Sequence, residues 1–156
     1  MLVNMGRSKG FTLIEVMIVV VIVSVLLAIG LPAYQEQVRK TKRSIARGEL
    51  LEVLARQEQY FINNKTYAEY LVKLGYSDAV SNEYAVDDDT NSGAPGSGIY
   101  NIKLVPLPNA TLPVLTFRLE ADPTGSQSKD NLCKKLTINQ AGIKGENGTG
   151  EVSDCW

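Results

Sequence analysis

Histidine is absent from this chain of 156 residues, and only two cysteines are present. The first absence removes the side chain that most often serves as a general base and as a transition-metal ligand. Without histidine or a third cysteine, the two cysteines also fall short of a zinc site. An excess of one charge is missing as well, since 16 basic residues stand against 17 acidic ones. A strongly basic nucleic-acid-binding domain is therefore not the default interpretation.

Recognisable catalytic motifs are missing too. The sequence holds no nucleophile elbow, phosphate-binding loop or cluster of metal-ligand residues. Neighbouring carboxylates such as Asp88 and Asp89 occur, but chance supplies such pairs. We therefore expect one domain, no enzymatic activity and no cofactor.

What the sequence does have is one long apolar run near its N-terminus. From Phe11 to Ala33 only Glu15 is charged. About 20 predominantly apolar residues cross a bilayer, and a single segment satisfies its backbone hydrogen bonds in lipid only as a helix. The run is too long for the core of a cleaved secretory signal, and no convincing signal-peptidase site follows it. We expect residues 11–34 to form a transmembrane helix.

Glu15 is unusual within this run. A carboxylate in an apolar transmembrane helix costs about 2–3 kcal/mol even on permissive insertion scales, and so indicates a function. The alternative is that Glu15 lies in the first helical turn, where the helix dipole and the lipid headgroups favour it. Composition alone does not choose between the two.

The residues around Glu15 carry a specific resemblance. Residues 9–15 read K-G-F-T-L-I-E, after a short basic segment and before an unbroken apolar stretch. This junction resembles the class III leader of type IV pilins and related pseudopilins. The resemblance implies that residues 1–10 are a cytoplasmic leader, which a prepilin peptidase cleaves between Gly10 and Phe11, and that Phe11 is N-methylated. It also implies that Glu15 neutralises the new amine of a neighbouring subunit during assembly.

The helix is expected to continue past Pro32 as an amphipathic half and to end at Asn63 or Asn64. Gly30 and Pro32 form a kink site, because proline removes one helical hydrogen bond, and pilins usually bend here. A coiled coil is disfavoured, since no heptad persists. The expected apolar stripe contains Tyr34, Val38, Thr41, Ile45, Gly48, Leu51 and Ala55, widened by Leu50, Leu54 and Phe61. The expected polar side contains Gln35, Arg39, Arg43, Arg47 and Arg56.

The rest of the chain predicts a small antiparallel sheet. Residues 67–76 read as a short connector that Gly75 can stop, and residues 77–98 as a loop whose acidic triplet lacks the ligand spacing of a calcium site. Period-two patterns then occur at 100–104, 115–120 and 135–139. The fold class is therefore α+β: a long N-terminal helix packed on a sheet, in a head spanning 35–156, as in the type IV pilin fold.

The two cysteines, Cys133 and Cys155, are compatible with buried thiols, half a metal site or a disulfide. A disulfide is expected if the head lies outside the cytoplasmic membrane, and closing this loop stabilises by about 3 kcal/mol in the chain-entropy model. The segment 133–142 and the ending 154–156 resemble minor type IV pilins and DNA-uptake pilins. In these proteins the disulfide-bounded C-terminal region is exposed.

The charges that flank the apolar run give a conflicting signal about topology. Five cations follow it closely and two precede it, so the positive-inside rule would place the head in the cytoplasm. The leader and the cysteines indicate the opposite, and we expect a periplasmic head that becomes extracellular in the fibre. The five cations are Arg39, Lys40, Lys42, Arg43 and Arg47.

The resemblance implies a structural, minor subunit of a type IV pilus that supports pilus biogenesis, twitching motility, adhesion or DNA uptake. Its partners would be other pilin subunits, the prepilin peptidase and the assembly platform of the inner membrane. A pseudopilin of a type II secretion system is one alternative. A DNA-binding competence pilin is another, with phosphate contacts from Lys134, Lys135 and Lys144. From Tyr76 onward only 6 basic residues face 11 acidic ones, which disfavours DNA.

Overall fold

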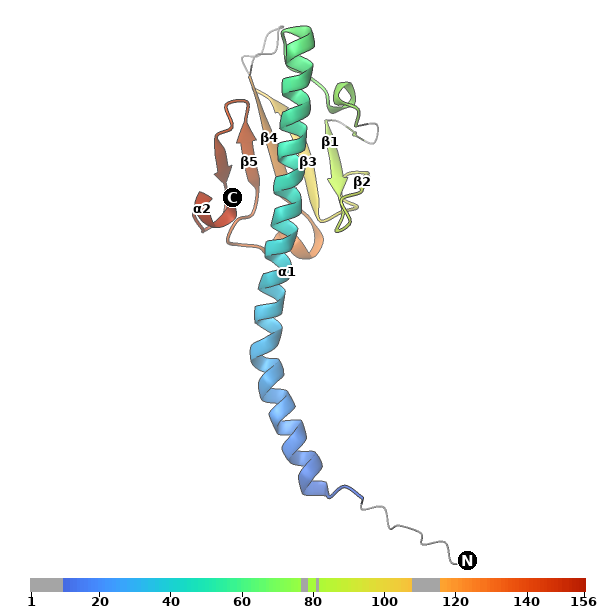
Figure 1. The fold of residues 1–156 in the computed structure, drawn as a ribbon, viewed down its shortest axis with the longest axis vertical. Helices are drawn as coiled ribbons and strands as arrows, with labels where there is room; N and C mark the ends of the chain where they lie inside the picture. The colour runs from blue at the N-terminus through green and yellow to red at the C-terminus, as the bar shows by residue number, and fades with distance from the viewer. Residues whose placement is uncertain (1–9, 77–78, 81, 108–115) are drawn as a thin grey trace, which may run out of the picture. The chain divides into compact units, whose positions relative to one another are not determined.

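A computed structural model describes residues 10–76, 79–80, 82–107 and 116–156. The chain divides into two compact units, one ending at Val38 and one running from Arg39 to Trp156. The leader residues 1–9 and the start of the second expected strand lie outside the described residues. The elements are α1 (Leu13–Asn64), η1 (Leu71–Leu74), β1 (Glu83–Val86), β2 (Ser92–Gly93), β3 (Tyr100–Pro106), β4 (Phe117–Pro123), η2 (Gly125–Lys129), β5 (Leu136–Asn139), β6 (Lys144–Glu146) and α2 (Val152–Cys155) (Figure 1).

The first unit consists of the N-terminal part of α1. The backbone N–H of Glu15 donates to Oγ1 of Thr12 at 3.3 Å, so a threonine caps the helix start. The helix continues through Gly30 and Pro32 without interruption, and a bend at these residues stays a prediction. The apolar part is long enough to cross a membrane, and none of its apolar window is buried.

The head, residues 39–156, is an α+β unit, which confirms the expected fold class. Within it α1 crosses one face of a six-stranded antiparallel sheet with the strand order β2-β1-β3-β4-β5-β6 (Figure 1). The core lies between the two layers, with Leu50 and Val53 of α1 fully buried. The sheet side of this core includes Tyr84, Tyr100, Ile102, Leu104, Phe117, Leu119, Leu136 and Ile138.

The buried face of α1 is rotated from the expected stripe. The helix residues that are buried are Arg43, Ala46, Leu50, Val53 and Gln57. Leu50 was expected there, whereas Leu51 exposes 47 % of its surface. The expectation that Arg43 lies on the polar side was wrong. Two polar residues occupy the buried face because Arg43 meets the carboxylate of Asp130 and Gln57 meets the backbone of Ala68. A hydrophobic pattern does not register such partners.

The three expected strands are confirmed as β3, β4 and β5, and three others were missed. The segment 77–98 was read as a loop, yet it contains β1 and β2, and β6 forms in the glycine-rich cystine segment. These strands have two to four residues and exist through pairing, for example Tyr84 with Ile102 and Lys144 with Ile138. Strand formation depends on neighbouring strands more than on local propensity, so short edge strands escape pattern reading.

Two side-chain amides hold the connector between α1 and the sheet. Gln57, fully buried, donates to the carbonyl of Ala68 at 3.0 Å and accepts from the Ala68 N–H at 2.8 Å. Asn82 likewise accepts from the Leu71 N–H and donates to the Glu69 carbonyl, both at 2.7 Å. The connector ends at Gly75, whose φ of 92° suits glycine, as the sequence indicated.

Candidate functional site

The expected cleavage junction lies directly before α1. Gly10, Phe11 and Thr12 have no regular secondary structure, and Phe11 exposes 83 % of its surface. Glu15 is in the first turn and exposed. Within the described part of the chain, no cation forms an ion pair with its carboxylate. The junction is therefore accessible, and Glu15 remains available to a charge on another molecule.

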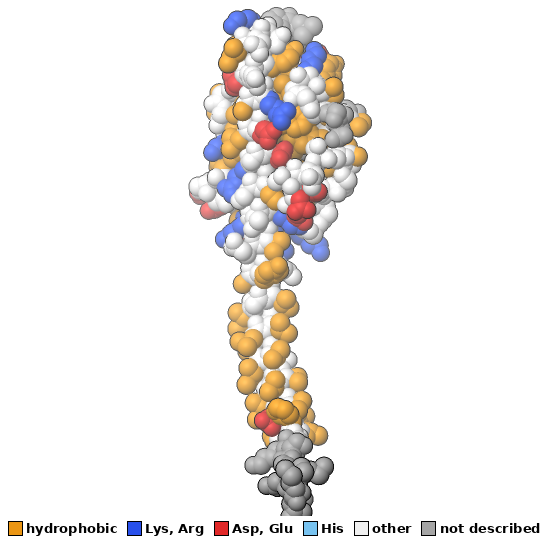
Figure 2. Space-filling view, turned by 45° about the vertical axis from the view of Figure 1, so that its right-hand side comes forward, with side chains coloured by type: hydrophobic (Ala, Val, Ile, Leu, Met, Phe, Trp, Pro, Cys, Tyr) orange, Lys and Arg blue, Asp and Glu red, His pale blue; other side chains and the backbone are white. Residues whose placement is uncertain are grey.

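Apolar side chains surround α1 in the first unit on every side. On the face that Figure 2 shows, orange side chains line this part of the helix on both sides of the white backbone. Ile14, Val19 and Leu26 expose 64 %, 53 % and 64 % of their surface. A helix that is hydrophobic all round requires lipid or other helices around it. This surface is suited to insertion in a bilayer or to packing against copies of the same helix.

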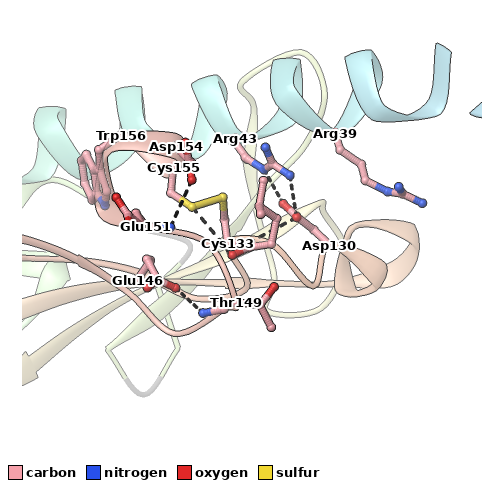
Figure 3. The surroundings of a disulfide bond; sticks show 12 residues. Arg39, Arg43, Asp130, Cys133, Glu146, Thr149, Glu151, Asp154, Cys155 and Trp156 are labelled. Atoms are coloured by element: carbon pink, nitrogen blue, oxygen red, sulfur yellow. Dashed lines mark hydrogen bonds and ion pairs between the residues drawn. A yellow bond between two sulfur atoms is a disulfide. The ribbon is translucent and has the colours of Figure 1, made fainter. Parts of the chain in front are cut away.

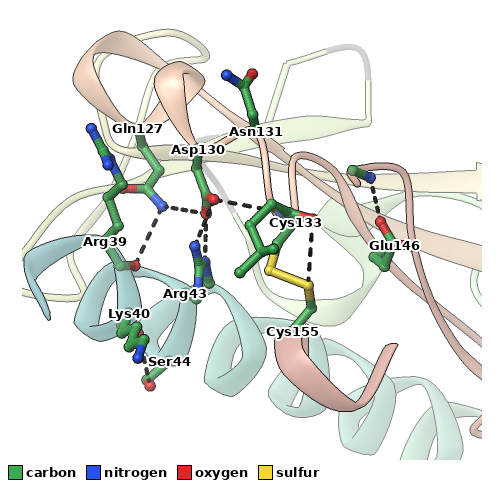
Figure 4. A network of polar contacts seen from close by, with 12 residues as sticks. Arg39, Lys40, Arg43, Ser44, Gln127, Asp130, Asn131, Cys133, Glu146 and Cys155 are labelled. Carbon is green, nitrogen blue, oxygen red and sulfur yellow. Dashed lines mark hydrogen bonds and ion pairs between the residues drawn. A yellow bond between two sulfur atoms is a disulfide. The ribbon is translucent and has the colours of Figure 1, made fainter. Parts of the chain in front are cut away.

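A buried ion pair lies where α1 meets the C-terminal half of the head. Arg43 donates to both carboxylate oxygens of Asp130, at 2.5 and 2.6 Å, and the two side chains expose only 3 % and 1 % (Figure 4). Gln127 donates to Asp130 at 3.1 Å and to the Tyr100 hydroxyl at 3.0 Å. Burial raises the pKa of Tyr100 to about 12, so it stays a neutral member of the network.

The same network reaches the disulfide. The backbone N–H of Cys133 donates to Asp130 at 3.4 Å, and Cys133 is bonded to Cys155 (Figure 3). The expected disulfide is therefore present in the structure. Arg43 and Asp130 stand 87 positions apart, and no local signal in the sequence identifies Asp130 as the partner. Sequence reasoning missed this pair.

The region enclosed by the disulfide has its own backbone framework. The N–H groups of Thr149 and Gly150 donate to the carbonyls of Asn131 and Leu132 at 3.0 and 2.8 Å. Gly148 fits here because it has no side chain: a Cβ atom would lie 2.1 Å from the carbonyl oxygen of Leu132. Residues 148–150 thus run beside residues 131–132, and the glycine at 148 permits this close approach of the two backbone segments.

Trp156 fastens the end of this region. Its indole N–H donates to the carbonyl of Gly145 in edge strand β6 at 2.9 Å. Its main-chain oxygen accepts from Arg47 of α1 at 3.0 Å. The indole thus occupies a backbone acceptor of the edge strand β6, a group that could otherwise pair with a strand of another chain.

The three lysines suggested for phosphate contact do not form one patch. Lys135 bonds to Glu120 at 2.6 Å and to Asp122 at 3.2 Å on the sheet face away from α1. Lys144 of β6 stands opposite Ile138 of β5, whose side chain faces the core, so Lys144 lies on the face of the sheet opposite to Lys135. Its Nζ is 5.2 Å from the centroid of the Trp156 ring. Lys134 is exposed at a turn, with φ of 44°.

The carboxylate of Glu120 is matched by the charges around it. Burial raises its pKa, but hydrogen bonds from Lys135 and Arg118 outweigh burial and lower the pKa below its usual value. Arg118 lies 2.6 Å from one carboxylate oxygen and Lys135 2.6 Å from the other. Lys135 is thus committed to an ion-pair network on the sheet.

The acidic triplet is organised by its own turn. The Asp87 carboxylate accepts from the backbone N–H groups of Asp89 and Asn91, at 2.9 and 2.8 Å. A hydrogen bond from the Asn91 side chain, together with these, lowers the pKa of Asp87. Asp88 forms an ion pair with Lys42 at 3.3 Å. Among the described residues, no group of three or more His, Cys, Asp or Glu side chains is placed to hold a metal ion.

Comparison with known proteins gives two family matches and several relatives. A family model described as "Type IV minor pilin ComP, DNA uptake sequence receptor" matches residues 32–137, and one described as "Prokaryotic N-terminal methylation motif" matches residues 5–31. The Type IV major pilin PilA of Myxococcus xanthus is 30 % identical over 126 residues, which cover 76 % of this chain and 56 % of that protein. The Type IV major alpha-pilin of Moraxella bovis is 52 % identical over 46 residues, covering 30 % of this chain and 29 % of that protein.

The matches to these two relatives thus span about half of one and less than a third of the other. A Type IV major fimbrial protein FimA of Dichelobacter nodosus is 29 % identical over 121 residues, with 76 % of this chain and 68 % of that protein covered. A solved type IV pilin from Shewanella oneidensis matches 68 % of this chain and 89 % of its own, at 20 % identity and a TM-score of 0.41.

Proposed function

This chain belongs to the family whose model is described as "Type IV minor pilin ComP, DNA uptake sequence receptor". We propose that it is a structural, minor subunit of a type IV pilus. The observation that supports this proposal most strongly is a helical segment whose surface is apolar and exposed on all sides. Its one carboxylate, Glu15, lies one turn from the accessible Gly10–Phe11 bond. Such an apolar helix surface is unfavourable in water, and it would be removed from water by lipid or by the helical core of a fibre.

The proposed mechanism begins at the Gly10–Phe11 bond. Cleavage by a prepilin peptidase removes residues 1–10 and leaves a positive amine on Phe11, which N-methylation keeps cationic. Glu15 of a neighbouring subunit then neutralises this amine as both helices leave the lipid. Losing one partner of a buried ion pair costs about 3–5 kcal/mol, so the pair would fix the axial stagger between subunits.

Assembly then follows from one repeated contact. A heterologous interface that does not close into a ring generates a helical filament. The partners would be other pilin subunits, the assembly platform in the inner membrane and a cytoplasmic ATPase motor. A pseudopilin of a type II secretion system would use the same N-terminal device, but the match of residues 32–137 to a minor pilin family supports the pilus.

We further infer a periplasmic head before assembly. The disulfide between Cys133 and Cys155 suits an oxidising compartment. Three cations that conflict with this topology have partners in the head: Arg43 bonds Asp130, Lys42 bonds Asp88, and Arg47 bonds the main-chain oxygen of Trp156. Their presence after the span is thus explained by folding of the head.

The test is mass spectrometry of sheared filaments together with variants at Glu15. Filaments should contain a chain that begins at methylated Phe11, and its abundance reports whether the subunit is minor. Glu15→Val should still be processed but fail to enter filaments, while Glu15→Asp, which keeps the charge, should retain part of the incorporation. Normal incorporation of Glu15→Val would contradict the charge-pairing mechanism, and a chain that retains residues 1–10 in the fibre would contradict the proposal as a whole.

A second candidate function is DNA capture, which the description of the matching family supports. The exposed cations Lys134 and Lys144 are the candidates for phosphate contact, whereas Lys135 is held by Glu120. Full-length protein in detergent should then bind duplex DNA with a salt dependence that weakens by about 0.9 in slope for each of these two lysines replaced by glutamine. Lys135→Gln, the matched control, should leave the slope unchanged. Absence of binding at low salt would exclude this function.

A further inference from the structure

A polar cavity opens between the last turns of α1 and the short helix η1. Its volume is about 440 Å³, within the range of small-molecule sites. Its walls carry the polar side chains of Arg56, Gln59, Asn63 and Lys73. All of these belong to the head, and the cavity lies at the end of α1 that is remote from Arg39.

The sequence builds this cavity from two elements. Residues 56, 59 and 63 are spaced three and four apart, so they share one face of the helix. The chain turns away after Asn64, where Lys65 adopts a φ of 57°, and η1 returns to form the opposite wall. Arg56 ties the walls together, since its Nη1 donates to the carbonyl of Leu74 at 3.0 Å.

The charge of Arg56 is already balanced. Its guanidinium forms a forked pair with Glu52, at 2.6 and 3.1 Å, and lies 4.7 Å from the centroid of the Tyr76 ring. Lys73 differs, because no carboxylate of the described residues forms an ion pair with its ammonium, which lies 5.7 Å from the Tyr70 ring centroid. No carboxylate is among the lining residues. The cavity therefore presents a single uncompensated positive charge.

The remaining lining groups suit hydroxyl groups. Within the described part of the chain, the side-chain amides of Gln59 and Asn63 form no hydrogen bond, and an amide both donates and accepts. Beside Lys73, the Tyr70 ring is half exposed and belongs to an adjoining apolar hollow with Val72. An exposed aromatic face accommodates the apolar face of a sugar ring.

We propose that this cavity binds one acidic sugar residue of a glycan. The carboxylate would pair with Lys73, the hydroxyl groups would bond with the amides of Gln59 and Asn63, and the ring would rest beside Tyr70. Uronic and sialic acids share this chemistry. A nucleic acid fits less well, because its phosphates require a series of cations and the cavity presents one uncompensated charge.

The experiment is NMR titration of the full-length protein in detergent micelles, with methyl glucuronide, a methyl sialoside and methyl glucoside as probes. An acidic sugar should shift the side-chain amide signals of Gln59 and Asn63, and comparison of the two acids identifies the preferred source. Lys73→Gln should weaken this binding about tenfold, the loss expected for one charge-assisted hydrogen bond. Lys65→Gln is the matched control, because it removes a charge at the same end of the head without altering the lining, and it should bind as the unchanged protein does.

Four results would overturn the proposal. The first is an absence of shifts with both acids, and the second is equal shifts with methyl glucoside. The third is displacement of the acidic sugar by duplex DNA, which would assign the cavity to nucleic acid. The fourth is equal weakening in Lys73→Gln and Lys65→Gln, which would reduce the effect to general charge. Since both variants are at exposed positions, their folding is checked by unchanged backbone spectra.

Discussion

Breaking the buried pair between Arg43 and Asp130 should destabilise the head strongly. The substitution Asp130→Ala leaves the guanidinium of Arg43 in place, with a side chain that is only 3 % exposed and has lost two hydrogen bonds of 2.5 and 2.6 Å. Gln127 loses an acceptor at the same time. Removing one partner of a buried ion pair costs about 3–5 kcal/mol, because the other charge stays buried after losing its carboxylate.

Replacing both partners should cost far less. Arg43→Met with Asp130→Leu keeps the volume apolar, and such exchanges are often neutral or stabilising by about 1–4 kcal/mol. The double variant therefore separates the penalty of a stranded charge from the contribution of the pair. The pair of Lys42 and Asp88, at 3.3 Å with side chains 16 % and 62 % exposed, is far more accessible to water and is the matched control. Lys42→Ala should cost about 1 kcal/mol or less.

The assay is denaturant unfolding of the full-length chain in detergent. Trp156 is the one tryptophan in the sequence and bonds to both Gly145 and Arg47, so its fluorescence follows the C-terminal region and its attachment to α1. Asp130→Ala should lower the free energy of unfolding far more than either Lys42→Ala or the double variant does. A loss for Asp130→Ala no larger than that for Lys42→Ala would refute the reasoning, and so would a double variant as unstable as the single one.

Three further outcomes are expected. Gly148→Ala should destabilise the cystine region, because its Cβ would lie 2.1 Å from the carbonyl oxygen of Leu132, and amide exchange there should accelerate; unchanged exchange would argue against the close approach. Because folding lowers the pKa of Glu120, its carboxylate stabilises the head at pH values above its unfolded pKa, and this stabilisation is lost as pH falls through the folded pKa. In Glu120→Gln the free energy of unfolding should therefore decrease less steeply at acidic pH. An unchanged acidic decrease would contradict this. Cys155→Ser should lower the free energy of unfolding by about 3 kcal/mol relative to oxidised wild-type protein in a denaturant titration, and reduction of the wild type should cause the same loss. A larger loss in Cys155→Ser than reduction causes would contradict an effect of the cross-link alone.

Several parts of this protein could be predicted from local sequence pattern alone. The uninterrupted apolar run, with one carboxylate at Glu15, already predicts that residues 11–34 must be surrounded by lipid or by other helices. Alternation of apolar residues placed β3, β4 and β5, and Gly75 marked the end of the connector. These features are readable because burial of a helix face or a strand face imposes its period on neighbouring residues.

The positions of buried polar groups and the availability of charged side chains could not be predicted without the three-dimensional fold. Arg43 reads as a surface residue until Asp130 supplies its partner, and Gln57 is buried because it bonds to the Ala68 backbone. Lys135 reads as a DNA contact until Glu120 pairs with it. The reason is physical: a polar side chain is stable inside a protein only when its partner is there, and the partner is set by the fold rather than by position along the chain.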